Sequence, residues 1–306
     1  MASLRDIRTR IGSVQNTQQI TRAMKMVAAA KLRRAQESIF QTRPYAFKIR
    51  EMIAHLREFV DPASHPLFQA REVETVLMVV VTSDRGLAGA FNTNILKRAE
   101  AAISEQFAEL RGTERLKILA VGRKAHDYFS KRGFTMEGDY RGFFNDLSFA
   151  RTDAIADRAV EGWIEGEWDE VVVVYNEFKN TISQNRIVEP FLPVPQGTFT
   201  TPVMEADEGY SAEEELGRDV DYIFEPDAES ILRQLIPQYL SYQLWRVVLE
   251  SNAAEQGARM VAMDNATSNA GELLDQLKLT YNRARQAAIT TEIIEISSGA
   301  EALQAG

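Results

Sequence analysis

The sequence contains no cysteine and only three histidines among its 306 residues. Without cysteine, the chain has no disulfide, no thiolate nucleophile and no cysteine-ligated metal site. His55, His65 and His126 lie far apart and show no metal-ligand spacing. A G-x-S-x-G nucleophile motif is also missing. We therefore predict no catalytic residues, no metal site and no cofactor.

Long apolar runs are missing as well. The longest, "VLMVVV" and "VVVVY", have the length of strands, and neither approaches the roughly 18 residues that a membrane-spanning helix needs. The first residues, "MASLRDIRTRIGS", lack the apolar core of a secretory signal. We expect a chain that has no covalent membrane anchor.

Acidic residues are missing from one stretch and crowded in another. The stretch from Ile7 to Gln36 holds seven basic residues and no acid, whereas residues 205–229 hold eleven acids and one base. An exposed helix usually mixes both signs to gain i,i+4 pairs, so the acid-free stretch predicts an acidic partner. A nucleic acid would use the same bases, but the net charge of −9 disfavours it.

Proline and glycine are scarce in both terminal segments, which favours long helices. Near the N-terminus, Leu4, Ile7 and Ile11 follow the alternating spacing of a coiled coil. A strict heptad walk in the C-terminal segment starts at Ile231 and Leu235 and continues through many small or polar positions. At 1.5 Å per residue the two helices would be roughly 85 Å and roughly 100 Å long. We predict that they pair antiparallel and that the C-terminal tip overhangs.

The middle segment alternates predicted strands and helices. Strands are expected at residues 73–83, 115–122 and 169–178, with a fourth at the sheet edge over 183–194 because of its prolines. Helices are expected at 92–110 and 123–133. This alternation predicts a doubly wound, mostly parallel sheet. The expected division is 1–60, 61–225 with a mobile acidic loop near 198–225, and 226–306.

The stretch "TSDRGLAGAFN" follows the first predicted strand, where a nucleotide-binding fold would place its glycine loop. Only Gly86 and Gly89 are present, which matches neither G-x-G-x-x-G nor a Walker A loop. A tight turn against a helix N-terminus is the favoured interpretation. The alternative function is a nucleotide-binding α/β enzyme with helical extensions.

Four stretches together resemble the gamma subunits of the rotary F-type ATP synthases, over essentially the whole chain. They are "SVQNTQQITRAMKMVAAAKLRRAQ", "RPYAFKIREMIAHL", "TSDRGLAGAFN" and the C-terminal run from "NAAEQGARMVAMDNATSN" to "SSGAEAL". The resemblance implies a mixed α and α/β fold, with a long antiparallel coiled coil of the terminal helices and a central Rossmann-like α/β domain. It also implies a non-catalytic rotor shaft that couples proton flow to conformational change in catalytic beta subunits.

The implied partners are the ring of alpha and beta subunits, the epsilon subunit and the membrane ring of c subunits. Met24, with Lys25 beside it, matches a position that faces an acidic segment of a beta subunit. Arg285 and Gln286 match positions that engage a beta-subunit loop. The tip beyond them matches the part that turns in an apolar bearing, and its predicted contacts are Ile289, Ile293 and Ile296.

Two features depart from the family pattern or bear on location. Ala88 stands where many family members carry cysteine, so no thiol chemistry can be essential there. No transit peptide precedes the family's start. We therefore expect a bacterial protein, held peripherally at the cytoplasmic face of the cell membrane.

Overall fold

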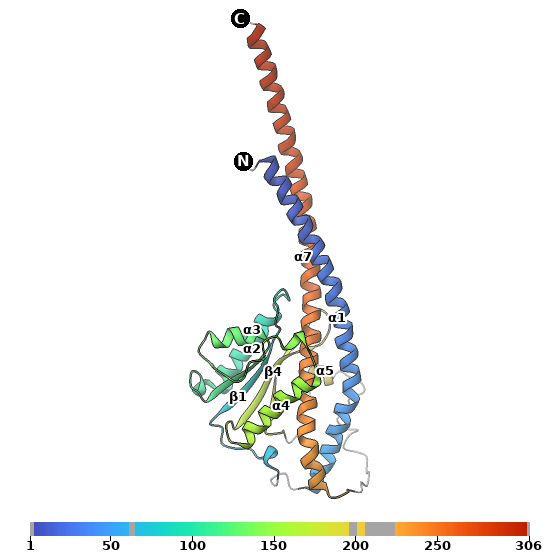
Figure 1. Cartoon of the computed structure of the whole chain (residues 1–306), viewed down its shortest axis with the longest axis vertical. Helices are drawn as coiled ribbons and strands as arrows, with labels where there is room; N and C mark the ends of the chain where they lie inside the picture. Colours follow the sequence, from blue (N-terminus) through green and yellow to red (C-terminus); the bar gives the residue numbers. More distant parts are fainter. Residues whose placement is uncertain (1–2, 61–64, 196–200, 206–223, 305–306) are drawn as a thin grey trace. The chain divides into compact units, whose positions relative to one another are not determined.

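Two long helices and a central sheet make up the protein (Figure 1). The computed structural model describes residues 3–60, 65–195, 201–205 and 224–304. The helices are α1 (Leu4–Phe59) and α7 (Ala228–Gln304). The chain divides into two compact units, one of Ala28–Arg259 and one of Met1–Val27 with Met260–Gly306. Most of the predicted acidic loop, residues 206–223, lies outside the described residues.

The larger unit contains a five-stranded sheet. Its strands are β1 (Val76–Val81), β2 (Leu116–Val121), β3 (Thr135–Met136), β4 (Glu170–Phe178) and β5 (Gln184–Leu192). They lie in the order β3-β2-β1-β4-β5, and only the β4–β5 pair is antiparallel. The predicted mostly parallel sheet is confirmed, and so is the edge position of the strand that contains Pro190.

The helices of this unit cover both faces of the sheet. They are α2 (Phe91–Gln106), α3 (Arg123–Ser130), α4 (Phe149–Ile164) and the short α5 (Pro202–Glu205). Side chains of β1 alternate between two cores: Val76 and Met78 pack with α2 and α3, while Leu77 and Val79 pack with α4, α1 and α7. The continuous apolar run of β1 is therefore explained by burial on both faces.

Part of α7 belongs to this second core. Its fully buried side chains Leu232, Ile236 and Leu240 follow a spacing of four residues. The predicted heptad register is wrong here, because Ile231 and Leu235 are only half-buried. This stretch packs against the sheet and α4 as well as α1, so its buried stripe is set by a domain core rather than by a two-helix seam.

One close approach in this core requires glycine. Gly162 on α4 faces the ring of Trp168, which is fully buried and donates from Nε1 to the Ala159 carbonyl over 2.8 Å. A Cβ at position 162 would overlap that ring. Glycine lowers the stability of the helix itself, but it allows the helix to pack closely on the indole ring of Trp168.

We expect Gly162→Ala to destabilise the chain by about 1–3 kcal/mol, because the added methyl group forces the buried Trp168 ring to move. Urea unfolding of the full chain, followed by the fluorescence of the buried Trp163 and Trp168, measures the change. Gly86→Ala is the control. It meets open space in the same unit, and its effect should stay within about 0.5 kcal/mol. Equal midpoints for the two variants would contradict the prediction.

Candidate functional site

The smaller unit is a pair of antiparallel helices. The Thr21 hydroxyl of α1 lies 2.8 Å from the Thr267 hydroxyl of α7, and the next turn of α1 meets the preceding turn of α7, with Lys25 Nζ 2.6 Å from Asp264 Oδ1. Rising numbers on one helix therefore face falling numbers on the other. The predicted antiparallel pairing is confirmed, whereas the predicted small or polar seam holds only in part, because three of its five buried residues are large and apolar. The buried residues of this seam are Ile7, Thr21, Met263, Ala270 and Leu274.

Lys25 has an acidic partner within the chain. We expected the basic residues between Ile7 and Gln36 to pair with acids of another chain, and for Lys25 this expectation is wrong. The side chains of Lys25 and Asp264 remain 40% and 54% exposed, so the pair contributes at most about 1 kcal/mol. Such a weak pair can be exchanged for another acid at small cost.

The side of α1 near Met24 offers apolar groups to the surroundings. Met24 itself is half-buried. Ile20, Met26 and Val27 are 59%, 63% and 56% exposed. Methionine and β-branched groups on one exposed helical stretch form a surface that suits changing contacts. The predicted contact of Met24 with a partner stays a prediction.

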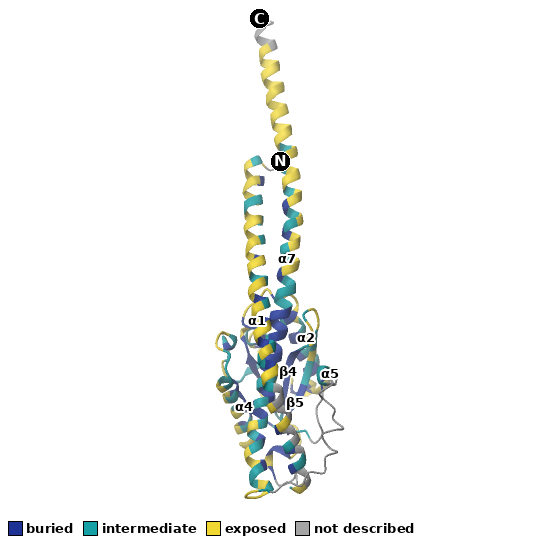
Figure 2. Cartoon of the chain, turned by 90° about the vertical axis from the view of Figure 1, so that its right-hand side faces the viewer, coloured by how far each residue is buried: buried dark blue, intermediate teal, exposed yellow. Residues whose placement is uncertain are grey.

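The C-terminal part of α7 has no neighbour among the described residues. Every residue from Arg285 to Ala300 is exposed, and this stretch extends past the start of α1 (Figure 2). The predicted overhang is confirmed. Its isoleucines Ile289, Ile293 and Ile296 are 48%, 60% and 67% exposed, and Arg285 and Gln286 are exposed as well. Their partner contacts remain predictions.

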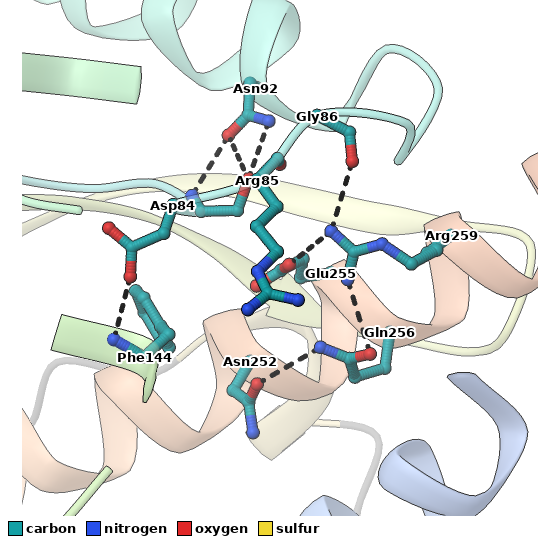
Figure 3. Close-up of polar contacts among 10 residues, drawn as sticks. Asp84, Arg85, Gly86, Asn92, Phe144, Asn252, Glu255, Gln256 and Arg259 are labelled. Carbon is teal, nitrogen blue, oxygen red and sulfur yellow. Dashed lines mark hydrogen bonds and ion pairs between the residues drawn. The ribbon is translucent and has the colours of Figure 1, made fainter. Parts of the chain in front are cut away.

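The loop after β1 contains the "TSDRGLAGAFN" stretch and is held by its own side chains. The Asp84 carboxylate accepts hydrogen bonds from the backbone N–H groups of Arg123 (2.9 Å), Gly142 (2.7 Å) and Phe144 (2.9 Å). Figure 3 shows the bond to Phe144. Arg123 is the first residue of α3. The carboxylate thus takes the place of an anion at the N-terminus of α3. The favoured tight-turn interpretation agrees with this geometry.

Two neighbours complete this arrangement. Ser83 exchanges hydrogen bonds with Asn92 at the start of α2. The Thr82 hydroxyl accepts from the backbone N–H of Ala125 over 2.8 Å. The polar residues of the stretch therefore fasten three loops at the carboxyl ends of the strands, and none of these three side chains is left to bind a ligand.

A buried charged network joins α7 to the edge of the sheet. Arg246 of α7 donates to both carboxylate oxygens of Glu189 on β5, over 2.6 Å and 2.8 Å. The Tyr175 hydroxyl accepts from Arg246 (3.0 Å) and donates to Glu189 (2.7 Å), and Gln243 adds a fourth hydrogen bond to this carboxylate. Burial opposes the Arg246 charge, but Glu189 and Tyr175 raise the pKa of this guanidinium well above its ordinary value.

Sequence reasoning missed both Asp84 and the Glu189–Arg246 pair. Asp84 gave a local signal, because an acid directly after a core strand and before a glycine is typical of a loop-fastening carboxylate. Glu189 gave a weaker signal, because it is an acidic residue among the apolar residues of a predicted edge strand. Its partner is 57 residues away, and no spacing rule connects them.

Within the described residues, no group of three or more histidine or acidic side chains could hold a metal ion. No helix in the described part of the chain is long and apolar enough to cross a membrane.

Comparison with known proteins gives full-length similarity. A family model described as ATP synthase matches residues 3–303. The chain is 57% identical to the ATP synthase gamma chain of Salinibacter ruber, over 99% of both chains. It is 52% identical to that of Chloroherpeton thalassium, again over 99% of both. A solved structure of the Euglena gracilis mitochondrial ATP synthase contains a chain of similar fold, with a TM-score of 0.63, 22% identity and coverage of 99% of this chain and 95% of that one.

We expect Arg246→Met to destabilise the larger unit by about 3–5 kcal/mol, because it leaves the Glu189 carboxylate buried without its cation. Combining it with Glu189→Leu should recover part of that loss, with a coupling energy of about 0.5–3 kcal/mol. Tryptophan-detected urea unfolding of the full chain measures both variants. Strictly additive effects would show that the two side chains are not energetically coupled.

Proposed function

Because the chain belongs to the ATP synthase gamma-chain family, we propose that it is the central rotor shaft of a proton-driven ATP synthase. It couples proton flow through a membrane ring to conformational change in the catalytic beta subunits, and it is a subunit of that complex rather than the catalyst. The observation that carries this function is the free end of α7, which is exposed on every side from Arg285 to Ala300.

A helix end of this kind is costly in water by itself. Burial of one isoleucine side chain stabilises by about 1.5–3 kcal/mol, and the tip exposes four of them, at positions 289, 293, 294 and 296. Ile289, Ile293 and Ile296 follow spacings of four and three and form a stripe along one face, and Ile294 widens the apolar surface on a neighbouring face. A sleeve of alpha and beta subunits around the tip supplies the missing contacts, and Arg285 with Gln286 lies at its entrance.

The side of the shaft works through weak, exchangeable contacts. An acidic segment of a beta subunit can compete with Asp264 for Lys25, because the existing pair is exposed. Met24 adapts its thioether to different neighbouring surfaces. Rotation changes a beta subunit only if its conformations make different contacts with the shaft. A surface with an apolar side and a cationic side satisfies this condition.

The sheet of the larger unit serves as the foot of the shaft. In this proposal it contacts the epsilon subunit and the ring of c subunits. The buried Glu189–Arg246 pair supports this role, because it fixes α7 to β5 in one register. We place the assembled protein at the cytoplasmic face of a bacterial membrane, held there by its partners. The bacterial origin of the relatives supports this location.

The alternative, a nucleotide-binding α/β enzyme, finds little support in the loop after β1. Ser83 of this loop is hydrogen-bonded to Asn92 at the start of α2, and the Asp84 carboxylate is bonded to the backbone at the start of α3. The shaft function therefore accounts for more of the chain than the enzyme does.

Co-expression with alpha- and beta-type chains of the same organism tests the function. We expect a complex in which this chain co-purifies with both. Replacing the tip residues Ile289, Ile293 and Ile296 with glutamine should weaken its retention at least about tenfold, since each loses ~1.5–3 kcal/mol of apolar burial. Glu292→Gln with Glu295→Gln, on the same exposed stretch, is the control and should assemble normally. Failure of the unmodified chain to co-purify would contradict the function.

We expect Met24→Lys to slow ATP-driven proton pumping by the assembled complex about threefold to tenfold, or ~1 kcal/mol in the barrier. The new ammonium group is either repelled by the basic arm or trapped by an acid of a beta subunit. The rate of ATP-driven proton uptake into membrane vesicles measures the effect. Met24→Leu, which keeps an apolar side chain, should retain the normal rate. An unchanged rate for Met24→Lys in a normally assembled complex would count against this contact.

A further inference from the structure

A cavity of ≈ 510 Å³ in the larger unit lies beside the loop after β1. Its walls come from α1, α7, that loop and the segment that precedes α4. Four basic and two acidic side chains line it. We propose that this cavity binds a polyvalent oxyanion of the phosphate class, through Lys31 and Arg34 of α1 and Arg85 of the loop. This inference goes beyond the shaft function and does not rest on it.

Both acids of the cavity are already satisfied. Asp84 accepts three backbone hydrogen bonds. Glu255 is buried and pairs with Arg259 over 2.6 Å, and Arg259 also donates to the Gly86 carbonyl. One acid thus neutralises one of the four bases, and the backbone dipoles around Asp84 offset the other acid.

In the part of the chain that the structure describes, the remaining three bases form no ion pair, although the charge of Lys31 acts on the nearby Glu255 carboxyl and opposes the rise that burial causes in its pKa. Within the described residues, the side chains of Lys31, Arg34 and Arg85 make no hydrogen bond or ion pair. Figure 3 shows the Arg85 guanidinium extending from the loop toward Asn252 and Glu255 of α7, with no contact drawn to it. Three unpaired cations around one hollow form a region of positive potential.

The other lining groups are suited to oxyanion oxygens. The side chains of Asn145 and Asn252 supply amide donors. Arginine binds phosphate oxygens in a bidentate way, while lysine acts as a point charge. A guanidinium from the loop and the bases of α1 can therefore approach an anion from two elements. The space is large enough for inorganic phosphate and for the phosphate chain of a nucleotide.

Equilibrium dialysis of the full chain against radiolabelled inorganic phosphate tests the proposal. We expect saturable binding to one site that weakens as potassium chloride is raised. Arg85→Gln and Lys31→Gln should each reduce the affinity about tenfold, the usual effect of losing one charged hydrogen bond. Neither substitution removes a hydrogen bond or ion pair within the described residues, so both variants should fold. Circular dichroism checks their folding. Lys97→Gln, an exposed base on α2, is the control and should bind phosphate normally.

Competition distinguishes the source of the anion. If ATP displaces phosphate and binds more tightly, the site takes phosphate carried by a nucleotide; if ATP does not displace it, the site takes the free anion. Both results support an oxyanion site. Absence of saturable binding would overturn the proposal. So would equal losses in the Lys97→Gln control, which would indicate diffuse attraction, or displacement by adenosine, which carries no phosphate.

Discussion

The burial of α7 against the edge of the sheet is the contact on which the larger unit depends. Leu232, Ile236 and Leu240 place one side of the helix in the same core as β1 and α4. Apolar contacts alone would tolerate a shift of the helix along its axis. The ion pair between Arg246 and Glu189 does not, because a shift by one turn would leave a guanidinium and a carboxylate buried apart. A charged pair thus gives this contact its register, while the apolar side chains supply most of its stability.

The loop after β1 is fastened by internal hydrogen bonds at a place where folds of this topology often bind a ligand. A doubly wound sheet offers ligands the crevice at the carboxyl ends of its strands. Here the Asp84 carboxylate is bonded to backbone N–H groups at the start of α3 and before α4, and Ser83 with Asn92 ties down the start of α2. The loop becomes a rigid fastening between β1, α3 and the approach to α4. What remains open lies on the side of α1 and α7, where the lining charges are mostly basic.

Much of this fold follows from local pattern, and the rest depends on contacts between distant residues. β1, β2 and β4 are apolar runs bounded by turns, and the prolines of β5 mark it as an edge strand, so each is readable. β3 has two residues and therefore no period. α4 was not predicted, since small residues such as Ala156 and Ala159 dilute its apolar stripe. The heptad register failed at Ile231 because the sheet and α4, as well as α1, pack against this part of α7. The tip stripe was readable, but its partners belong to other chains.

The two units place charge in opposite ways, and this difference matters for a rotating part. In the larger unit, the side chains of Arg246 and Glu189 are only 12% and 3% exposed. Separating them would leave two buried charges with neither water nor a counter-ion, which is costly. In the smaller unit, Lys25 and Asp264 are exposed, and water or another acid can replace either partner at little cost. A shaft must hold its own register firmly and yet release each neighbour in turn. Burying one ion pair and exposing the other achieves both with the same chemical groups.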